Sequence, residues 1–376
     1  MSIEAATSLA GTSEGGALRF VYETLPGRVV FGCDAIRSLD EEVERLGGSR
    51  VAILCSGSAT AGARTIRELL DGRVVAQIDY IRPHVPMTDV VAARRLVDES
   101  GADAIVAIGG GSAIGLGKAV MLEHSARFIA IPTTYSGSEM TSIYGMTHDG
   151  VKRTGRDERV KPALVIYDPE LTIDLPRGVT AGSIMNALGH CVEALYAEAR
   201  NPVISSLALD GVVALHAGAT IVVDAPTDID GRSRLLYGAF AAGLALGAVG
   251  MAIHHRICHV LGGTFGLSHG DANSVVLPHV VSANSESEPA VMRRLGAALG
   301  ADDPAGALFD LARRIGAPQR LDQLGIQHSD IDKAADLIVE RAGWNPRPLR
   351  RDWIVALLED AWTGRRPTCP HGEEKT

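Results

Sequence analysis

The chain has few cysteines, few aromatic residues and no excess of positive charge. These shortages limit the compartment and the partners that we expect for the protein. Among 376 residues there are five cysteines, an odd number without a CxxC pair, which is typical of a reducing compartment. The formal net charge of −9 disfavours nucleic acid and anionic membranes as partners. No uninterrupted apolar run reaches the roughly 18 residues of a membrane-spanning helix. Residues 1–17 lack the basic and apolar regions of a signal peptide, so we expect a disordered lead-in and a cytoplasmic protein.

The length and the order of the apolar segments predict two domains. A chain of 376 residues is too long for one ordinary hydrophobic core. In the first half, short runs rich in β-branched residues alternate with stretches of helical periodicity, which predicts a mostly parallel sheet between helices. The strands are expected at 28–31, 51–54, 74–78, 104–108, 128–131 and 163–167, and helices at 60–70 and 89–99. After Asp168 the strand pattern stops, so we expect an α/β domain at 18–178 and an all-α domain at 179–376.

Three glycines follow the expected strand at 104–108. Gly109–Gly111 lead into a helix expected near Ala113, where glycines let a ligand approach the backbone and the helix start offers free N–H groups to a phosphate. The segment is neither the GxGxxG fingerprint nor a P-loop, because Lys118 is followed by Ala119. Ligands of open α/β sheets bind at the carboxyl ends of strands, which favours a pyrophosphate-binding turn over a merely tight connection.

A loop dense in hydroxyl groups, residues 132–141, follows the next expected strand. Taken alone, such a loop is only a helix cap, but its place beside the glycines favours contacts to ribose, nicotinamide and phosphate. Ser56 ends the strand at 51–54, and a serine neither bonds a ribose strongly nor repels a 2′-phosphate, so NADH and NADPH should both be usable. The expected cofactor-binding residues are Ser56, Gly109, Gly110, Gly111, Ser112, Lys118, Thr133, Thr134, Ser136 and Ser138.

Seven of the twelve histidines lie between positions 190 and 279. Asn186 and His190 are four residues apart, as are His255 and His259, so each pair shares a helix face, and His269 follows in a glycine-rich turn. Three histidines can hold zinc, but the amide of Asn186 is a poorer ligand than a carboxylate. The cluster therefore leaves two readings open, a metal centre and a metal-independent site in which histidine moves protons, and we favour the second.

Together these segments resemble the iron-containing, or group III, alcohol dehydrogenase family from about residue 20 to residue 367. The resemblance rests on Gly109–Ser112 with Lys118, on Pro132–Thr134, and on the histidines that end at His269. Within the family, residues 186–196 and 254–265 look like maleylacetate reductases. The resemblance implies an α/β dinucleotide-binding domain, an all-α substrate domain and a cleft between them, the architecture of dehydroquinate synthase. It also implies that metal-using members carry an aspartate at position 186.

The resemblance implies a function as well. Maleylacetate reductases use NADH or NADPH to reduce the double bond of maleylacetate to 3-oxoadipate during the breakdown of aromatic compounds. The alternatives are a metal-dependent alcohol or polyol dehydrogenase of the same fold, a lyase of the dehydroquinate synthase type, and a non-enzymatic NAD-binding protein. A homodimer is expected from family habit. The expected catalytic residues are His255, His259, His190, His269 and Asn186, and the expected substrate-binding residues are Tyr135, Arg156, His254 and Arg256.

Overall fold

The computed structural model describes residue 22 and residues 27–79, 81–148, 151–340 and 343–369, so the expected lead-in at 1–17 lies outside the described residues. The chain divides into two compact units. Among the described residues, the α/β unit contains residues 27–180 and Gly218–Gly243, and the helical unit contains residue 22, Ala181–Ala217 and residues 244–369.

A six-stranded parallel sheet forms the centre of the α/β unit, as the sequence predicted. Its strand order is β1-β8-β5-β4-β2-β3. Every residue of β2 and of β4 is buried, which is typical of a parallel sheet covered on both faces. The strands are β1 (Arg28–Phe31), β2 (Val51–Cys55), β3 (Val74–Ile78), β4 (Ala104–Gly109), β5 (Arg127–Pro132) and β8 (Leu164–Tyr167).

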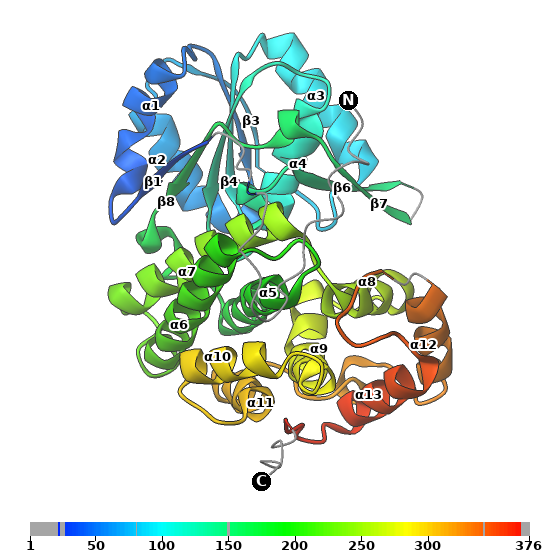
Figure 1. Cartoon of the computed structure of the whole chain (residues 1–376). Helices are drawn as coiled ribbons and strands as arrows, with labels where there is room; N and C mark the ends of the chain where they lie inside the picture. Colours follow the sequence, from blue (N-terminus) through cyan, green and yellow to red (C-terminus); the bar gives the residue numbers. More distant parts are fainter. Residues whose placement is uncertain (1–21, 23–26, 80, 149–150, 341–342, 370–376) are drawn as a thin grey trace. The chain divides into compact units, whose positions relative to one another are not determined.

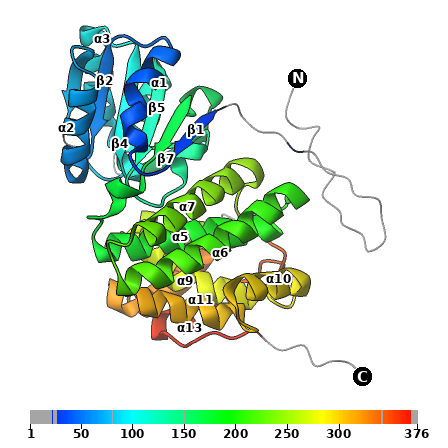
Figure 2. The same cartoon turned by 90° about the vertical axis from the view of Figure 1, so that its left-hand side faces the viewer.

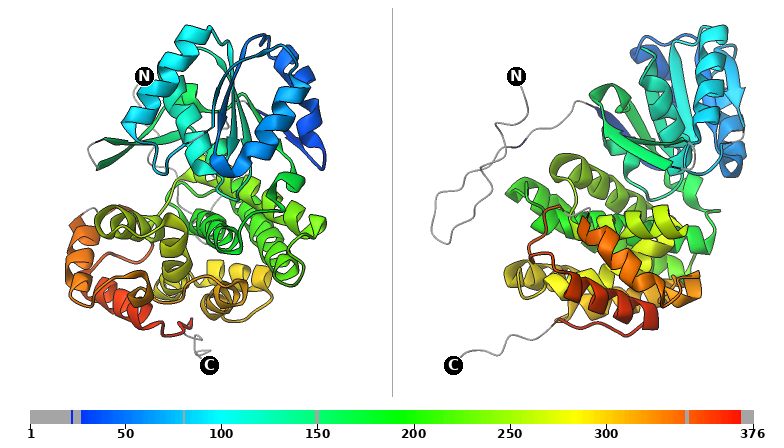
Figure 3. Two further views of the ribbon diagram at one scale, coloured as in Figure 1. Left: turned by 180° about the vertical axis from the view of Figure 1, so that it is seen from behind. Right: turned by 90° about the vertical axis from the view of Figure 1, so that its right-hand side faces the viewer.

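Helices cover both faces of this sheet (Figures 1 and 3). Helices α1 (Leu39–Arg45) and α2 (Thr60–Leu69) bury their apolar faces with alternate strand residues such as Ile53 and Val106. Helices α3 (Met87–Ser100) and α4 (Gly111–Met121) lie on the opposite face. Since successive strand residues point to opposite faces, the continuous apolar strands supply both cores.

The sequence analysis missed an antiparallel hairpin in this unit. Strands β6 (Ile143–His148) and β7 (Val151–Arg156) pair from Ile143 opposite Arg156 to His148 opposite Val151. Both strands mix polar and apolar residues, so they lack the apolar run that marks the strands of the parallel sheet.

Residues 218–243, which the sequence analysis assigned to the second domain, pack in the α/β unit. Two contacts explain why. A Cβ on Gly243 would lie 2.3 Å from the carbonyl oxygen of Gly137, so only glycine allows this approach. Arg232 is 2% exposed and donates to Tyr135 Oη and to the carbonyl oxygen of Pro226.

The helical unit is built around α9. Its apolar residues share a core with those of α8, α12 and α13, and Figure 2 shows α11 and α13 beside α9. The helices after the sheet are α5 (Arg177–Tyr196), α6 (Pro202–Asp224), α7 (Ile229–Val249), α8 (Ile253–Phe265), α9 (His269–Asn284), α10 (Pro289–Leu299), α11 (Pro304–Ile315), α12 (Asp330–Glu340) and α13 (Arg351–Thr363). The fold class is therefore confirmed: a parallel α/β part is followed by helices.

One helix in the described part of the chain, α6, has the length and mean hydropathy of a membrane span, 1.7 over its best window. The bent pair α7 and α8 passes the same test together. The sequence of α6 contains no long uninterrupted apolar run, because polar residues such as Asp210 interrupt it. Core helices of soluble proteins pass the same test.

Candidate functional site

The glycine-rich segment lies at the point where the sheet reverses its order. The chain leaves β2 toward β3 on one side and leaves β4 toward β5 on the other, so the carboxyl ends of β2 and β4 flank a topological switch point. Ser56 and Gly109 meet there, with Ser56 N donating to the carbonyl oxygen of Ile108 at 3.2 Å. Gly109 has a φ of 143°, and a Cβ on it would lie 2.3 Å from Ser56 Oγ, so only glycine fits.

Helix α4 starts directly after this turn, at Gly111, two residues earlier than the sequence predicted. Its N-cap is Gly110, which has no side chain to bond the first N–H groups, and these can therefore bind a phosphate. Thr134 lies beside Gly110, because a Cβ there would be 3.0 Å from Thr134 Cγ2, and Thr133 N donates to the carbonyl oxygen of Gly109 at 3.0 Å. The structure thus brings the glycines and the hydroxyl loop together, and the residues fit a dinucleotide.

Lys118 lies beneath the hydroxyl loop and anchors it. Its side chain is fully buried, and Nζ donates to the carbonyl oxygens of Ser138 at 2.6 Å, Thr141 at 2.9 Å and Ile143 at 2.7 Å. Burial lowers the pKa of Lys118 to about 7, and the charge of Glu139 opposes this shift. We predicted a direct contact with the cofactor, and the structure instead shows Lys118 holding the loop from behind.

Two residues predicted to bind substrate belong to the α/β unit. Tyr135 is fully buried, donates to Thr172 Oγ1 at 3.2 Å and accepts from Arg232 Nη1 at 3.1 Å, so its hydroxyl is engaged within the core. Arg156 ends β7 and is exposed. The predicted histidines, by contrast, belong to the helical unit.

In the helical unit the predicted histidines do come together. His190 on α5 stacks on His255 of α8, with ring centroids 4.3 Å apart and planes 9° from parallel. His269, at the start of α9, lies 6.0 Å from His255 and 5.8 Å from His259, again between ring centroids. Asn186 is 6% exposed and precedes His190 by one turn of α5.

The sequence analysis missed Glu193, which links α5 to this cluster. Its Oε1 accepts from His254 N at 2.7 Å and its Oε2 lies 2.7 Å from His255 Nδ1. Burial raises the pKa of Glu193, and the backbone N–H groups of Ala252, His254 and His255 oppose that rise. The spacing of positions 186, 190 and 193 places all three on one helix face, which was the available signal.

A pocket of about 270 Å³ opens beside the cluster. It is lined by Met251, Ala252, His255, Arg256, His259 and Val260. Within the part of the chain that the structure describes, His255 Nε2 has no hydrogen-bond partner.

The buried histidines are held neutral. Burial lowers the pKa of His190 to about 3, that of His254 to about 4 and that of His255 well below its ordinary value. His254, which we predicted to contact substrate, is fully buried behind the pocket with Nε2 2.7 Å from Asn273 Oδ1. One helix position separates it from His255 by about 100°, which is why only one of the two faces the pocket.

The four positions that the resemblance assigned to a metal do not form a coordination shell here. Among the described residues, no three His, Cys, Asp or Glu side chains are arranged to hold an ion. The lone pair of an imidazole nitrogen lies in the ring plane, and the nearly parallel planes of His190 and His255 do not converge on one ion. Asn186 adds only a neutral amide. The residues therefore do not fit a metal centre in this arrangement.

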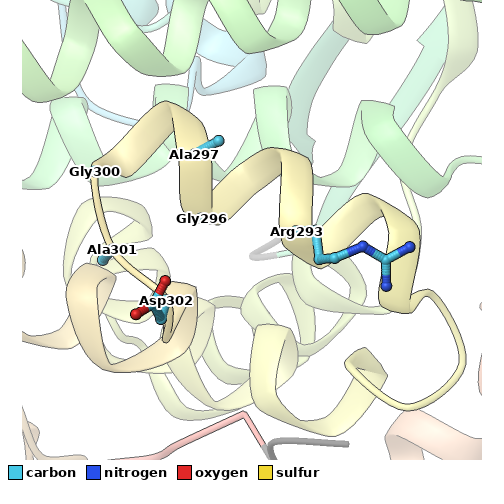
Figure 4. A pocket seen from close by; sticks show the side chains of 6 residues that line it. All are labelled: Arg293, Gly296, Ala297, Gly300, Ala301 and Asp302. Atoms are coloured by element: carbon cyan, nitrogen blue, oxygen red, sulfur yellow. The ribbon is translucent and has the colours of Figure 1, made fainter. Parts of the chain in front are cut away.

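A second hollow, of about 420 Å³, lies at the end of α10. Arg293 and Asp302 supply the charges of its lining, and Figure 4 shows the Arg293 side chain extending away from Asp302. The pocket beside the histidines, by contrast, is lined by two imidazoles and a guanidinium, which suit proton transfer and anion binding.

Two family models together match most of the chain. Residues 26–169 match the family model described as "Iron-containing alcohol dehydrogenase". Residues 180–362 match "Fe-containing alcohol dehydrogenase family, C-terminal".

Individual relatives are similar over nearly the whole chain. A maleylacetate reductase of Burkholderia cepacia is 45% identical over 349 residues, 93% of this chain and 99% of that protein. The crystal structure of maleylacetate reductase from Agrobacterium tumefaciens has a TM-score of 0.90 at 40% identity, over 93% of this chain and 100% of that one. That from Rhizobium sp. strain MTP-10005 has a TM-score of 0.89 at 40% identity, over 93% and 99%.

Proposed function

The chain belongs to the iron-containing alcohol dehydrogenase family, and on that premise we propose that it is an NAD(P)H-dependent reductase that converts maleylacetate to 3-oxoadipate. Relatives that match over nearly its full length include maleylacetate reductases at 43–45% identity. The observation that carries the proposal is the pocket in which His255, His259 and Arg256 meet. A volume of about 270 Å³ suits a small molecule, and a guanidinium beside two imidazoles suits an anion that must gain a proton.

The reaction adds a hydride and a proton across the double bond of the enone, with NAD(P)H oxidised to NAD(P)⁺. When bound by residues 109–112 and 133–134, NAD(P)H would supply the hydride that the carbon β to the ketone accepts. The electron pair of the double bond then moves toward the ketone oxygen, so this oxygen gains negative charge, and a proton must reach the α carbon.

The residues of the helical unit meet these needs. His255, held on one side by Glu193, faces the pocket and can hydrogen-bond the ketone oxygen. His259 is exposed, so it exchanges protons with water and is the proton source. Arg256 lines the same pocket and pairs with a substrate carboxylate.

We propose further that the reaction needs no metal. Asn186 offers a neutral amide where a metal would favour a carboxylate, and the stacked rings of His190 and His255 do not converge on one ion. One observation favours the second candidate, a metal-dependent alcohol or polyol dehydrogenase. His190 Nδ1 and His255 Nε2 are buried and lack a hydrogen-bond partner among the described residues, and an ion can engage such nitrogens.

The remaining parts of the proposal follow from the sequence. NADH and NADPH should both serve, since Ser56 rather than an acidic residue lies at the switch point. We also propose a cytoplasmic homodimer that acts in aromatic-compound breakdown on a small dicarboxylate, with neither nucleic acid nor membrane as partner.

Oxidation of NADH and of NADPH by the purified protein, with and without maleylacetate, tests the proposal. We expect substrate-dependent oxidation of both cofactors, with specificity constants within about a hundred-fold, or 3 kcal/mol, of each other. No turnover with either cofactor would contradict the function. A larger preference would contradict only the interpretation of Ser56.

A further inference from the structure

The side chain of Arg256 leaves α8 on the side of the helix that lines the histidine pocket. The lining residues from 252 to 260 fall at positions i, i+3, i+4, i+7 and i+8, which make up one face of a helix. The stem of an arginine is flexible, so its guanidinium meets a carboxylate in a fixed geometry only where the surroundings hold it. The contacts that Arg256 makes beyond α8 therefore bear on substrate binding.

One of these contacts is with the backbone at Gly343. A Cβ on Gly343 would lie 2.3 Å from Arg256 Nη2, 3.0 Å from Cζ and 3.4 Å from Nε, and these are the nearest atoms to that position outside the adjoining residues. All three belong to the guanidinium group, so a side chain at position 343 would have to displace it. The guanidinium lies where it does because residue 343 is glycine.

The segment that begins at Gly343 is bonded to α9. Asn284 Nδ2 donates to Asn345 Oδ1 at 3.1 Å, and Asn345 Nδ2 donates to Asn284 Oδ1 at 2.8 Å. Asn284 is fully buried at the end of α9. Arg347 adds a bond from Nη1 to the carbonyl oxygen of Ala283 at 3.0 Å. The backbone against which the guanidinium lies is therefore joined to the core of the helical unit.

We propose that Gly343 is a positioning residue for substrate recognition: its bare backbone leaves the space in which the Arg256 guanidinium lies beside the histidine pocket. The proposal rests on the function proposed above, since it assumes that this guanidinium pairs with a substrate carboxylate. A side chain at position 343 would turn the guanidinium away. The enzyme would then lose its preference for an anionic substrate and keep the histidines that transfer the proton.

The variant Gly343→Ala tests the proposal, and Gly263→Ala is its matched control. Gly263 lies on α8, as Arg256 does, and a Cβ on it would meet nothing within 4 Å. We expect Gly343→Ala to lower kcat/KM for maleylacetate about 5- to 50-fold, and to change kcat/KM for an uncharged enone and the KM for NADH by less than about two-fold. Gly263→Ala should leave all three quantities unchanged.

A double-mutant cycle separates positioning from a general loss of structure. If residue 343 acts through Arg256, the loss caused by Gly343→Ala should disappear in an Arg256→Ala background, which has no guanidinium to displace. Nitrogen NMR of arginine-labelled protein follows the guanidinium itself, with the Arg256 signal assigned from Arg256→Ala. We expect Gly343→Ala to shift the Nε signal of Arg256 and Gly263→Ala to leave it in place.

Three results would overturn the proposal. They are an unchanged kcat/KM for maleylacetate in Gly343→Ala, an equal loss with the uncharged enone, and a loss of the same factor in the Arg256→Ala background. If Gly343→Ala does not fold, Asn345→Ala decides, because it releases the segment from Asn284. A lower preference for maleylacetate over the uncharged enone then supports the proposal, and an unchanged preference overturns it.

Failure of the proposed function gives a different result. If the wild type does not turn over maleylacetate, the function fails, and the Nε signal still shows whether residue 343 places the guanidinium. A shifted signal in Gly343→Ala supports that placement, and an unshifted signal overturns it.

Discussion

Replacing Lys118 by methionine tests whether this residue anchors the hydroxyl loop or contacts the cofactor. Methionine fills most of the space of the lysine stem but donates no hydrogen bonds. The carbonyl oxygens of Ser138, Thr141 and Ile143, at 2.6, 2.9 and 2.7 Å from Nζ, would lose this donor. That of Ser138 would keep its bonds from Thr141 N and Oγ1, so the loss falls on the other two. Each buried group left unsatisfied costs about 1–3 kcal/mol, and the removed cost of burying an ammonium offsets part of the sum, so we expect a net loss of about 3 kcal/mol.

The assay is urea unfolding of the protein without cofactor, followed by the KM for NADH. An anchor predicts that Lys118→Met lowers the free energy of unfolding before any cofactor is added, and that the KM for NADH rises because residues 132–141 lose their support. Lys333→Met is the control, because Lys333 lies on the surface helix α12 near Phe265 and should change neither quantity. A raised KM with an unchanged free energy of unfolding would refute the anchoring role and restore the direct contact that the sequence predicted.

Three further predictions concern the glycine turn, the pocket and a buried histidine. Gly109→Ala should raise the KM for NADH and lower the free energy of unfolding by about 1–3 kcal/mol, because a φ of 143° is strained for alanine. Adding Ser56→Gly should restore only the part of the loss that comes from the close contact with Ser56 Oγ. A Gly109→Ala variant with unchanged stability and KM would contradict this geometry. Arg256→Ala should lower kcat/KM for maleylacetate about 10- to 150-fold, or about 1.5–3 kcal/mol, and leave the KM for NADH unchanged. If kcat/KM for an uncharged enone fell by the same factor, Arg256 would not pair with a substrate carboxylate. Burial lowers the pKa of His279 from 6.5 to about 4, so the unfolded chain binds a proton first and stability falls as the pH drops from 6.5 toward 4. Between about pH 7.5 and pH 5, the free energy of unfolding measured with urea should therefore fall by about 2 kcal/mol less in His279→Leu than in the wild type. The same decrease in both proteins would contradict this prediction.

The sequence predicted the α/β unit well because its signals are local. A buried parallel strand is a continuous run of apolar residues, and a run of glycines at its end is visible without knowledge of the rest of the chain. The hairpin β6–β7 lacks such a run and was missed. The packing of residues 218–243 with the α/β unit was also missed, since it depends on close contacts such as Gly243 with Gly137 that connect distant parts of the chain.

The site shows the same division. Helical spacing and one glycine-rich turn were enough to predict that His190, His255, His259 and His269 lie close together. What each side chain does depends on burial and on partners from other elements, which spacing does not carry. Lysine is a common phosphate ligand, which is why the sequence predicted that Lys118 contacts the cofactor. In the fold, carbonyl oxygens of a different segment surround its Nζ, so Lys118 holds that segment in place.

Turnover of maleylacetate by protein freed of metal tests the central claim most directly. The protein is treated with EDTA, its content of iron, zinc and manganese is measured, and kcat/KM is compared with that of the untreated protein and of Asn186→Asp. We expect unchanged turnover with less metal than protein, and an Asn186→Asp variant that binds metal more tightly without reducing maleylacetate faster. Turnover that is lost on removal of a stoichiometric metal and returns with it would contradict histidine-based reduction, and an Asn186→Asp variant that gains both metal and activity would do the same.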